Sequence, residues 1–241
     1  PKNDPVVYTG GHNFFTLSRI IQDSEKIAAY SFIHSLSTSL GMSLYEEISV
    51  IVAKPHCEEC FRNYGVGGVI SQGQKKVIEA IIRELRNKNR KPDIKKEMQA
   101  ILKADRKNAS SQKSGNIADF YMKRKGKEFY FEIKTVKPNI DVFKESKNKL
   151  LEWTARKRKL IYPYLAFPYN PYHPKPYERF TQANFVKMNE DFLIGEKYWD
   201  FLGGRNTFHQ LLDVFDTIGK KYKKELVKKF KEIAKEKIDS Y

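Results

Sequence analysis

Two short segments near the middle of the chain carry the residues best suited to chemistry. Asp119 lies in the first segment, residues 115–122, and Glu132 and Lys134 lie in the second, residues 129–135. Each segment is typical of a short strand, and a Lys-Gly-Lys sequence between them offers a turn. Since side chains alternate along a strand, Glu132 and Lys134 share a face, and a hairpin would bring Asp119 beside them.

Two carboxylates and an ammonium on one face form an arrangement that is costly to leave unpaired. A divalent cation and a phosphodiester need this arrangement, because carboxylate oxygens are the ligands that hard cations prefer. The lysine can orient or help to deprotonate an attacking water, or stabilise charge on the phosphate. The alternative interpretation is a surface hairpin with one cross-strand ion pair, which many proteins have.

The charge balance indicates a polyanionic partner. The 241 residues include 45 Lys and Arg against 29 Asp and Glu, which gives a net charge of +16. Such a field favours nucleic acid first and an anionic membrane second. Hydrophobic residues make up 40% of the chain, enough for a real core, and we expect one domain.

The spacing of Asp119, Glu132, Ile133 and Lys134 resembles the signature of the PD-(D/E)XK nuclease superfamily, with Ala118 where the family has proline. The resemblance implies an α/β fold with a nuclease-like core: a central mixed sheet flanked by helices, with additional N- and C-terminal helices. It also implies a metal site formed by Asp119, Glu132 and Ile133. The expected cofactor is Mg²⁺, with Mn²⁺ able to substitute.

A further acidic residue is expected from the helix before the hairpin, where nucleases of this superfamily often place one facing the metal. Residues 74–87 have the apolar period of a helix and contain two candidates, Glu79 and Glu84. The resemblance favours Glu79 as a catalytic residue, and Glu84 is the alternative. Helical geometry places Glu79 nearly opposite the apolar stripe, so solvent exposure is the competing interpretation.

A run of basic residues follows the proposed metal site. Phosphate contacts need this density of cations and supply affinity that is independent of sequence. We therefore expect DNA contacts from Lys137, Lys147, Lys149, Arg156 and Arg158. The alternative is a solvated helix face.

The remaining pattern completes a single expected domain over residues 1–241. It has a helical N-terminal region to about residue 72, a catalytic core over about 73–170 and a helical C-terminal region over about 185–241. Asp141 is expected to cap a helix that runs to about Lys159. In the C-terminal region we predict three helices, over residues 191–201, 207–217 and 220–238.

The C-terminal segment makes the resemblance more specific. Residues 190–215 are similar to a pattern in type II restriction endonucleases of the TdeIII group. This resemblance implies a homodimer that cuts both strands of double-stranded DNA at a short, near-palindromic site, with GGNCC as the candidate. It also implies a cognate DNA methyltransferase encoded nearby.

Other features of the sequence bear on alternative functions. Cys57 and Cys60 form a CxxC, but a structural zinc site needs four ligands and no second pair exists. The apolar runs are too short for a transmembrane helix, and no secretory signal is visible, so we expect a cytoplasmic protein. A DNA repair or junction-resolving nuclease of the same fold is one alternative function. A non-catalytic basic nucleic-acid-binding protein is the other.

Overall fold

The computed structural model describes residues 43–110, 115–134, 138–170, 172, 175–177 and 184–239. Residues 42–210 form one compact unit, which contains the sheet. The helical residues 211–239 belong to a second unit. Residues 1–42 of the predicted helical N-terminal region lie outside the described residues.

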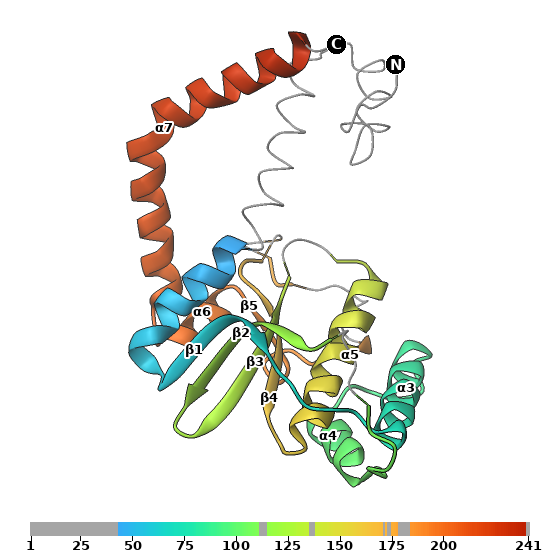
Figure 1. The fold of residues 1–241 in the computed structure, drawn as a ribbon. Coiled ribbons are helices and arrows are strands. Elements are labelled where there is room, and N and C mark those ends of the chain that lie inside the picture. Colours follow the sequence, from blue (N-terminus) through green and yellow to red (C-terminus); the bar gives the residue numbers. More distant parts are fainter. Residues whose placement is uncertain are drawn as a thin grey trace. The chain divides into compact units, whose positions relative to one another are not determined.

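A five-stranded mixed sheet forms the centre of the first unit (Figure 1). Its strands follow chain order: β1 (Glu59–Gly65), β2 (Ile117–Arg124), β3 (Lys127–Ile133), β4 (Tyr162–Phe167) and β5 (Phe192–Ile194). The first three strands are antiparallel neighbours, whereas β4 pairs parallel to β3 and β5 parallel to β4. The predicted hairpin is confirmed as β2 and β3, which turn at Lys125 and Gly126, both with positive φ.

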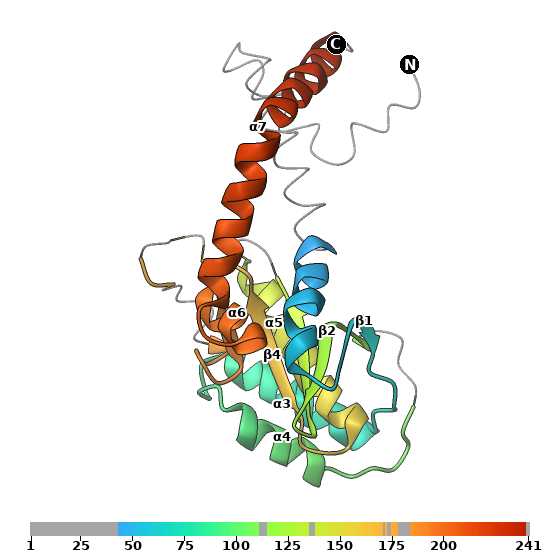
Figure 2. The same ribbon diagram turned by 90° about the vertical axis from the view of Figure 1, so that its left-hand side faces the viewer.

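Helices cover both faces of this sheet, as the two perpendicular views show (Figures 1 and 2). One layer consists of α5 (Ile140–Lys157), with α3 (Gln72–Arg86) and α4 (Ile94–Lys103) packed against it. The other layer contains the helix of residues 43–53 and α6 (Glu196–Gly203). The short 3₁₀ helix η2 (Lys54–His56) follows residue 53. This arrangement confirms the expected α/β class.

Alternation along β3 assigns its side chains to the two layers. The Tyr130 ring lies 6.1 Å from that of Trp153 on α5. Phe131 points the opposite way, with its ring 5.8 Å from that of Tyr198 on α6. Glu132 lies two residues after Tyr130 and is therefore on the α5 side of the sheet.

Local capping explains where the helices begin. The Ser71 hydroxyl accepts from the Gln74 backbone N–H, and the Gln74 side chain accepts from the Ser71 N–H, a reciprocal capping box that starts α3. At α5 the cap is Asn139, whose side chain accepts from the N–H of Val142 at 3.0 Å. The predicted cap, Asp141, is instead in the first turn. Both residues suit helix starts, so composition does not distinguish them.

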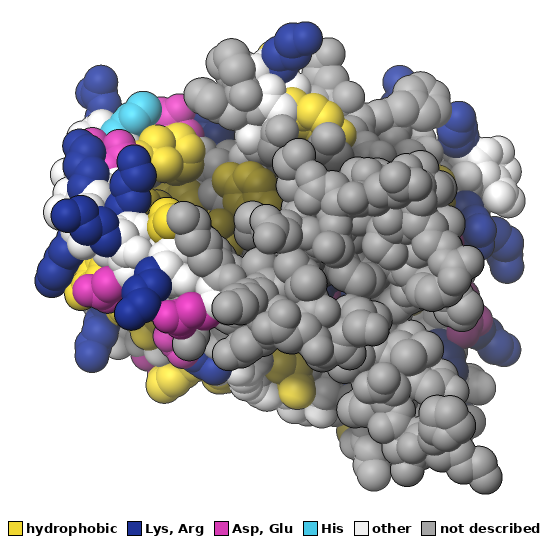
Figure 3. Space-filling view, turned by 90° about the horizontal axis from the view of Figure 1, so that it is seen from above, with side chains coloured by type: hydrophobic (Ala, Val, Ile, Leu, Met, Phe, Trp, Pro, Cys, Tyr) yellow, Lys and Arg dark blue, Asp and Glu magenta, His cyan; other side chains and the backbone are white. Residues whose placement is uncertain are grey.

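The C-terminal region differs from the predicted three helices. Residues 191–201 divide into β5 and α6, because the Leu165 N–H of β4 donates to the Asp191 carbonyl at 2.8 Å and β5 completes the sheet. The two later helices are one continuous helix, α7 (Thr207–Asp239). No helix among the described residues is long and apolar enough to cross a membrane. Figure 3 shows Lys and Arg side chains spread over the described part of the visible surface.

Candidate active site

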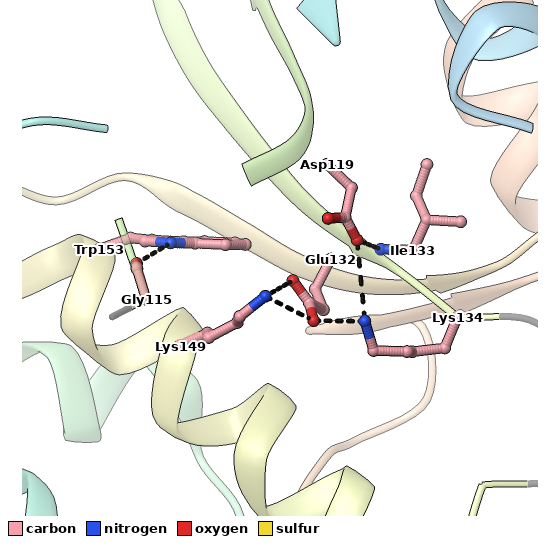
Figure 4. Close-up of polar contacts among 7 residues, drawn as sticks. All are labelled: Gly115, Asp119, Glu132, Ile133, Lys134, Lys149 and Trp153. Atoms are coloured by element: carbon pink, nitrogen blue, oxygen red, sulfur yellow. Dashed lines mark hydrogen bonds and ion pairs between the residues drawn. The ribbon is translucent and has the colours of Figure 1, made fainter. Parts of the chain in front are cut away.

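The two predicted carboxylates meet on neighbouring strands of the sheet (Figure 4). Phe120 of β2 pairs with Phe131 of β3, so the next residues along, Asp119 and Glu132, face each other across the strands. Asp119 Oδ2 accepts from the Ile133 backbone N–H at 2.7 Å, which fixes the carboxylate against β3. Both side chains are sheltered from solvent, with exposed fractions of 14% for Asp119 and 2% for Glu132.

Lys134 approaches both carboxylates from the end of β3. Its Nζ lies 2.5 Å from Glu132 Oε1 and 3.9 Å from Asp119 Oδ2. Its backbone N–H donates to the Ala166 carbonyl of β4 at 3.0 Å. The main chain under the lysine is therefore held by the parallel strand, and the three residues predicted to act together do lie together.

A second lysine, from α5, completes the cluster. Lys149 Nζ donates to both oxygens of Glu132, at 3.0 and 2.8 Å. Burial acts to lower the pKa of Lys149, but the charge of Glu132 and these hydrogen bonds outweigh it, and the pKa is raised. Two carboxylates and two ammonium groups therefore form a neutral cluster on the α5 side of the sheet.

Asp119 is the member of the cluster whose ionisation is most disfavoured. Burial, together with the neighbouring charge of Glu132, raises its pKa from the ordinary 3.8 to about 6, although Lys134 and the Ile133 N–H act to lower it. Two carboxylates held in mutual repulsion, with one of them desolvated, suit a divalent cation, which would relieve both penalties. The donor set therefore fits the expected metal, with Asp119 and Glu132 as carboxylate ligands.

This raised pKa predicts a definite pH dependence. Between pH 3.8 and about 6 the folded protein binds more protons at Asp119 than the unfolded chain, so without metal its stability should fall as the pH rises. Mg²⁺ should reverse the trend above about pH 6, because it binds the ionised carboxylate. Melting temperatures measured against pH, in chelator and in Mg²⁺, test this. Parallel curves would contradict the assignment of Asp119 as a ligand.

A groove opens beside the cluster along α5. It has a volume of about 430 Å³, and its lining residues are Gly115, Lys144, Glu145, Asn148, Lys149 and Glu152. Gly115 has a φ of 68°, and a Cβ there would lie 2.0 Å from a carboxylate oxygen of Glu152, so only glycine fits. The Gly115 carbonyl accepts from Trp153 Nε1 at 2.9 Å, which ties the start of β2 to α5 (Figure 4).

Two of the side chains predicted to contact phosphates are buried inside the protein. Lys147 is fully buried, and its ammonium lies 2.7 Å from both Glu97 and Asp191. Arg156 is only 5% exposed, and its guanidinium donates to the Gly68 carbonyl at 3.3 Å. Neither side chain is available to a DNA backbone, because α5 packs on other elements along most of its length.

The other basic residues are placed differently. Lys149 lies at the carboxylates, and its side chain is 33% exposed. Arg158 is exposed in the left-handed conformation that ends α5, so it remains a predicted phosphate contact. Lys137 lies outside the described residues.

The two glutamates predicted on the helix before the hairpin stay predictions, and a third helix glutamate is a further candidate. Glu79 is exposed on α3, which packs mainly on α4 and α5, and Glu84 pairs with Arg90 at 3.2 Å. Among the described residues neither has a hydrogen bond or ion pair with the cluster. Glu46, on the helix of residues 43–53, is instead 7% exposed. Burial raises its pKa, and the charges of Lys134 and Glu132 act on it.

A sequence signal for Glu46 exists, although it is weak. Glu46, Ser49 and Ala53 are the buried residues of this helix, and their spacing puts them on one face. The Ser49 hydroxyl hydrogen-bonds the Tyr198 hydroxyl at 2.7 Å, which fixes the helix to α6. A glutamate on a face with two small residues marks a helix that can approach its neighbours closely.

Substitutions of Glu46 and Glu79 should differ in their effect on the cleavage rate. We expect Glu46→Gln to lower the single-turnover rate by roughly tenfold to a hundredfold, as for groups that orient metal ligands. Glu79→Gln should remain within about twofold, because surface changes away from a site have small effects. Rates of both variants at saturating Mg²⁺ and matched protein stability decide the matter. A larger loss in Glu79→Gln would support Glu79 as the catalytic glutamate.

The cysteine pair offers no metal centre in the described part of the chain. Cys57 and Cys60 are free thiols, and Cys60 lies on the edge strand β1. Among the described residues no three His, Cys, Asp or Glu side chains are grouped so that they could hold a metal by themselves. A metal at Asp119 and Glu132 would therefore need further oxygens from the main chain, water or substrate.

Comparisons with known proteins agree with this site. A family model described as "Type II restriction endonuclease, HinfI" matches residues 13–219. The type II restriction enzyme MjaII of Methanocaldococcus jannaschii is 31% identical over 204 residues, which are 78% of this chain and 54% of MjaII. The type II restriction enzyme HgiCII of Herpetosiphon aurantiacus is 30% identical over 205 residues, 82% of this chain and 75% of HgiCII. No solved structure matches the chain.

These similarities place the chain among the type II restriction endonucleases, which confirms the resemblance to that class drawn from the sequence. Enzymes of this class generally use divalent metal ions. The matching model is the HinfI one, whereas the sequence resemblance names the TdeIII group. Since the model covers most of the chain, the protein belongs to the HinfI family of type II restriction endonucleases. The chain spans about half the length of MjaII, at 54%.

Proposed function

We propose that the protein is a Mg²⁺-dependent type II restriction endonuclease that hydrolyses both strands of double-stranded DNA at a short specific site. The observation that carries the proposal is the cluster of Asp119, Glu132 and Lys134 on adjacent strands. The net charge of +16 supports a DNA substrate. The recognition site proposed from the sequence resemblance is GGNCC.

Each residue of the cluster has a defined part in the proposed reaction. The metal, when bound at Asp119 and Glu132, would stabilise charge on the phosphate and lower the pKa of an attacking water. Lys134 lies 2.5 Å from Glu132, and its ammonium can hold that water by donating a hydrogen bond and stabilise the charge that develops on the phosphate. The Ile133 N–H fixes Asp119 in place, so the carboxylate needs little reorganisation to act. The Ile133 carbonyl stays a proposed metal ligand.

The partners follow from the same proposal. A homodimer would present two such clusters, one to each strand of a near-palindromic site. Apolar side chains exposed along α7 support a protein partner: Phe215, Ile218 and Tyr222 lie three and four residues apart and so share a face. A DNA methyltransferase of the same specificity, encoded nearby, would protect the host genome. We place this activity in the cytoplasm.

Plasmid digestion tests the function. With Mg²⁺ the protein should cut plasmid DNA into discrete fragments whose ends share one short sequence, and a chelator should abolish cutting. Prior methylation at that sequence should protect the DNA. Preference for branched or damaged DNA would instead favour a repair nuclease, and binding without any cleavage would favour a nucleic-acid-binding protein.

The role of Lys134 gives a further prediction. We expect Lys134→Ala to lower the single-turnover rate by roughly a hundredfold or more, within the range of a positioned proton-transfer or electrostatic group. DNA affinity in Ca²⁺ should change little, because the bound cation then neutralises the carboxylates. A variant that keeps the full rate but melts at a much lower temperature would show that Lys134 is only a structural ion pair.

A further inference from the structure

Lys149 hydrogen-bonds the carboxylate oxygens of Glu132 that a metal ion would need as ligands. It donates to both oxygens of Glu132, at 3.0 and 2.8 Å, while Lys134 already lies 2.5 Å from one of them. Glu132 is 2% exposed, so water cannot replace these partners freely. A cation that binds Glu132 therefore has to displace at least one ammonium group.

Of the two lysines, Lys149 is better placed to move. Lys134 has its backbone N–H bound to β4 and lies within reach of both carboxylates. Lys149 comes from α5, is the more exposed of the two at 33% against 23%, and also lines the groove of about 430 Å³. The groove gives its ammonium space to leave Glu132 without leaving the site.

The charge balance indicates where that ammonium would go. The two carboxylates and two lysines sum to zero, so a divalent cation leaves the cluster with two surplus positive charges. DNA phosphates, which carry one negative charge each, are the partners that would neutralise these two charges. The charges of the groove lining, Lys144 and Lys149 against Glu145 and Glu152, sum to zero, so the attraction for a phosphate comes from the bound cation.

We propose that Lys149 is a positioning residue that holds Glu132 in the metal-free protein and passes to a DNA phosphate when a divalent cation takes its place. The inference rests on the proposed function and deepens it, because it couples the binding of the metal ion to the binding of DNA. Metal binding releases the Lys149 ammonium to contact DNA, and bound DNA stabilises Lys149 away from Glu132. Each ligand should therefore tighten the binding of the other by the same factor.

The first arm of the test measures Mn²⁺ binding to the free protein by calorimetry, without DNA. Lys149→Gln should bind Mn²⁺ about tenfold more tightly than the wild type, since a charge-assisted competitor has been removed. Lys149→Arg retains a positive charge that competes with the metal, so it should not bind Mn²⁺ more tightly than the wild type. Lys144→Gln removes a charge from the same groove without contacting Glu132, so it measures the general effect of charge.

The second arm measures affinity for a short duplex of random sequence, with and without Ca²⁺. In the wild type Ca²⁺ should strengthen DNA binding markedly, and in Lys149→Gln this gain should fall about tenfold. The slope of log affinity against log salt, measured in Ca²⁺, should also fall by about one unit. The melting temperature of each variant confirms that it is folded before titration.

The outcomes distinguish the proposed role of Lys149 from the proposed endonuclease function on which it rests. Tighter Mn²⁺ binding in Lys149→Gln than in Lys144→Gln, together with a reduced Ca²⁺ gain, supports the exchange of partners. Equal or weaker Mn²⁺ binding in Lys149→Gln overturns it and leaves the metal site intact. If Lys149→Gln does not fold, tighter Mn²⁺ binding by Lys149→Arg than by the wild type would also overturn the exchange of partners. A wild-type protein that binds no Mn²⁺ overturns the proposed function as well.

Discussion

Replacing Asp119 with Asn is expected to lower the cleavage rate by roughly a thousandfold or more, while DNA binding in Ca²⁺ stays near normal or tightens. The asparagine oxygen can still accept from the Ile133 N–H, which lies 2.7 Å from the native carboxylate, so the strand pair should survive. What is lost is a negative charge beside the metal. Removal of that charge also weakens repulsion of the phosphates.

The measurement is single-turnover cleavage in Mg²⁺, paired with DNA affinity in Ca²⁺. Asp200 provides a matched control, because it is also a carboxylate that accepts from backbone N–H groups, those of Asn206 and Phe208 at 3.1 Å. Asp200→Asn should leave the chemical step nearly unchanged. Substantial Mg²⁺-dependent cutting by Asp119→Asn would remove Asp119 from the catalytic centre.

Loss of the buried ammonium of Lys147 should produce the largest change in stability. Its Nζ lies 2.7 Å from both Glu97 and Asp191, which tethers α5 to α4 and to the start of β5. Burial acts to lower the pKa of Lys147, but these two carboxylates outweigh it and raise the pKa. The lysine is therefore held charged inside the protein.

Lys147→Met leaves two carboxylates buried without their cation, which should cost about 3–5 kcal/mol of unfolding free energy and lower the melting temperature by about 10 °C or more. Lys144→Met, on a more exposed part of the same helix, should change stability by less than about 0.5 kcal/mol. Adding Glu97→Gln and Asp191→Asn to Lys147→Met should recover part of the loss. Equal melting temperatures for the two single variants would show that the cluster does not stabilise the fold.

The catalytic strand pair could be read from the sequence because its signals are local. The period of two in residues 129–135 puts Glu132 and Lys134 on one face, and the Lys-Gly-Lys turn brings Asp119 opposite. The structure shows both relations. The expected mixed sheet also forms, although β1 and β5 were not identified as strands.

The surroundings of the pair could not be read in the same way, because they depend on packing between distant segments. Lys147 looked like one more member of a basic run, yet its partners lie 50 residues before and 44 residues after it. Glu79 stands in a regular amphipathic helix, but α3 packs on α4 and α5 rather than on the strand ends. Glu46, from an earlier helix, is buried, and the charges of Lys134 and Glu132 act on its pKa.

A titration of divalent metal into the free protein tests the central claim most directly. The wild type should bind Mn²⁺ at a site that Mg²⁺ competes for, and the affinity should fall as the pH drops below about 6, where Asp119 becomes protonated. Asp119→Asn should weaken that binding by at least roughly tenfold to a hundredfold. Binding that is undiminished in Asp119→Asn, or absent from the wild type, would contradict the assignment of Asp119 and Glu132 as the metal centre.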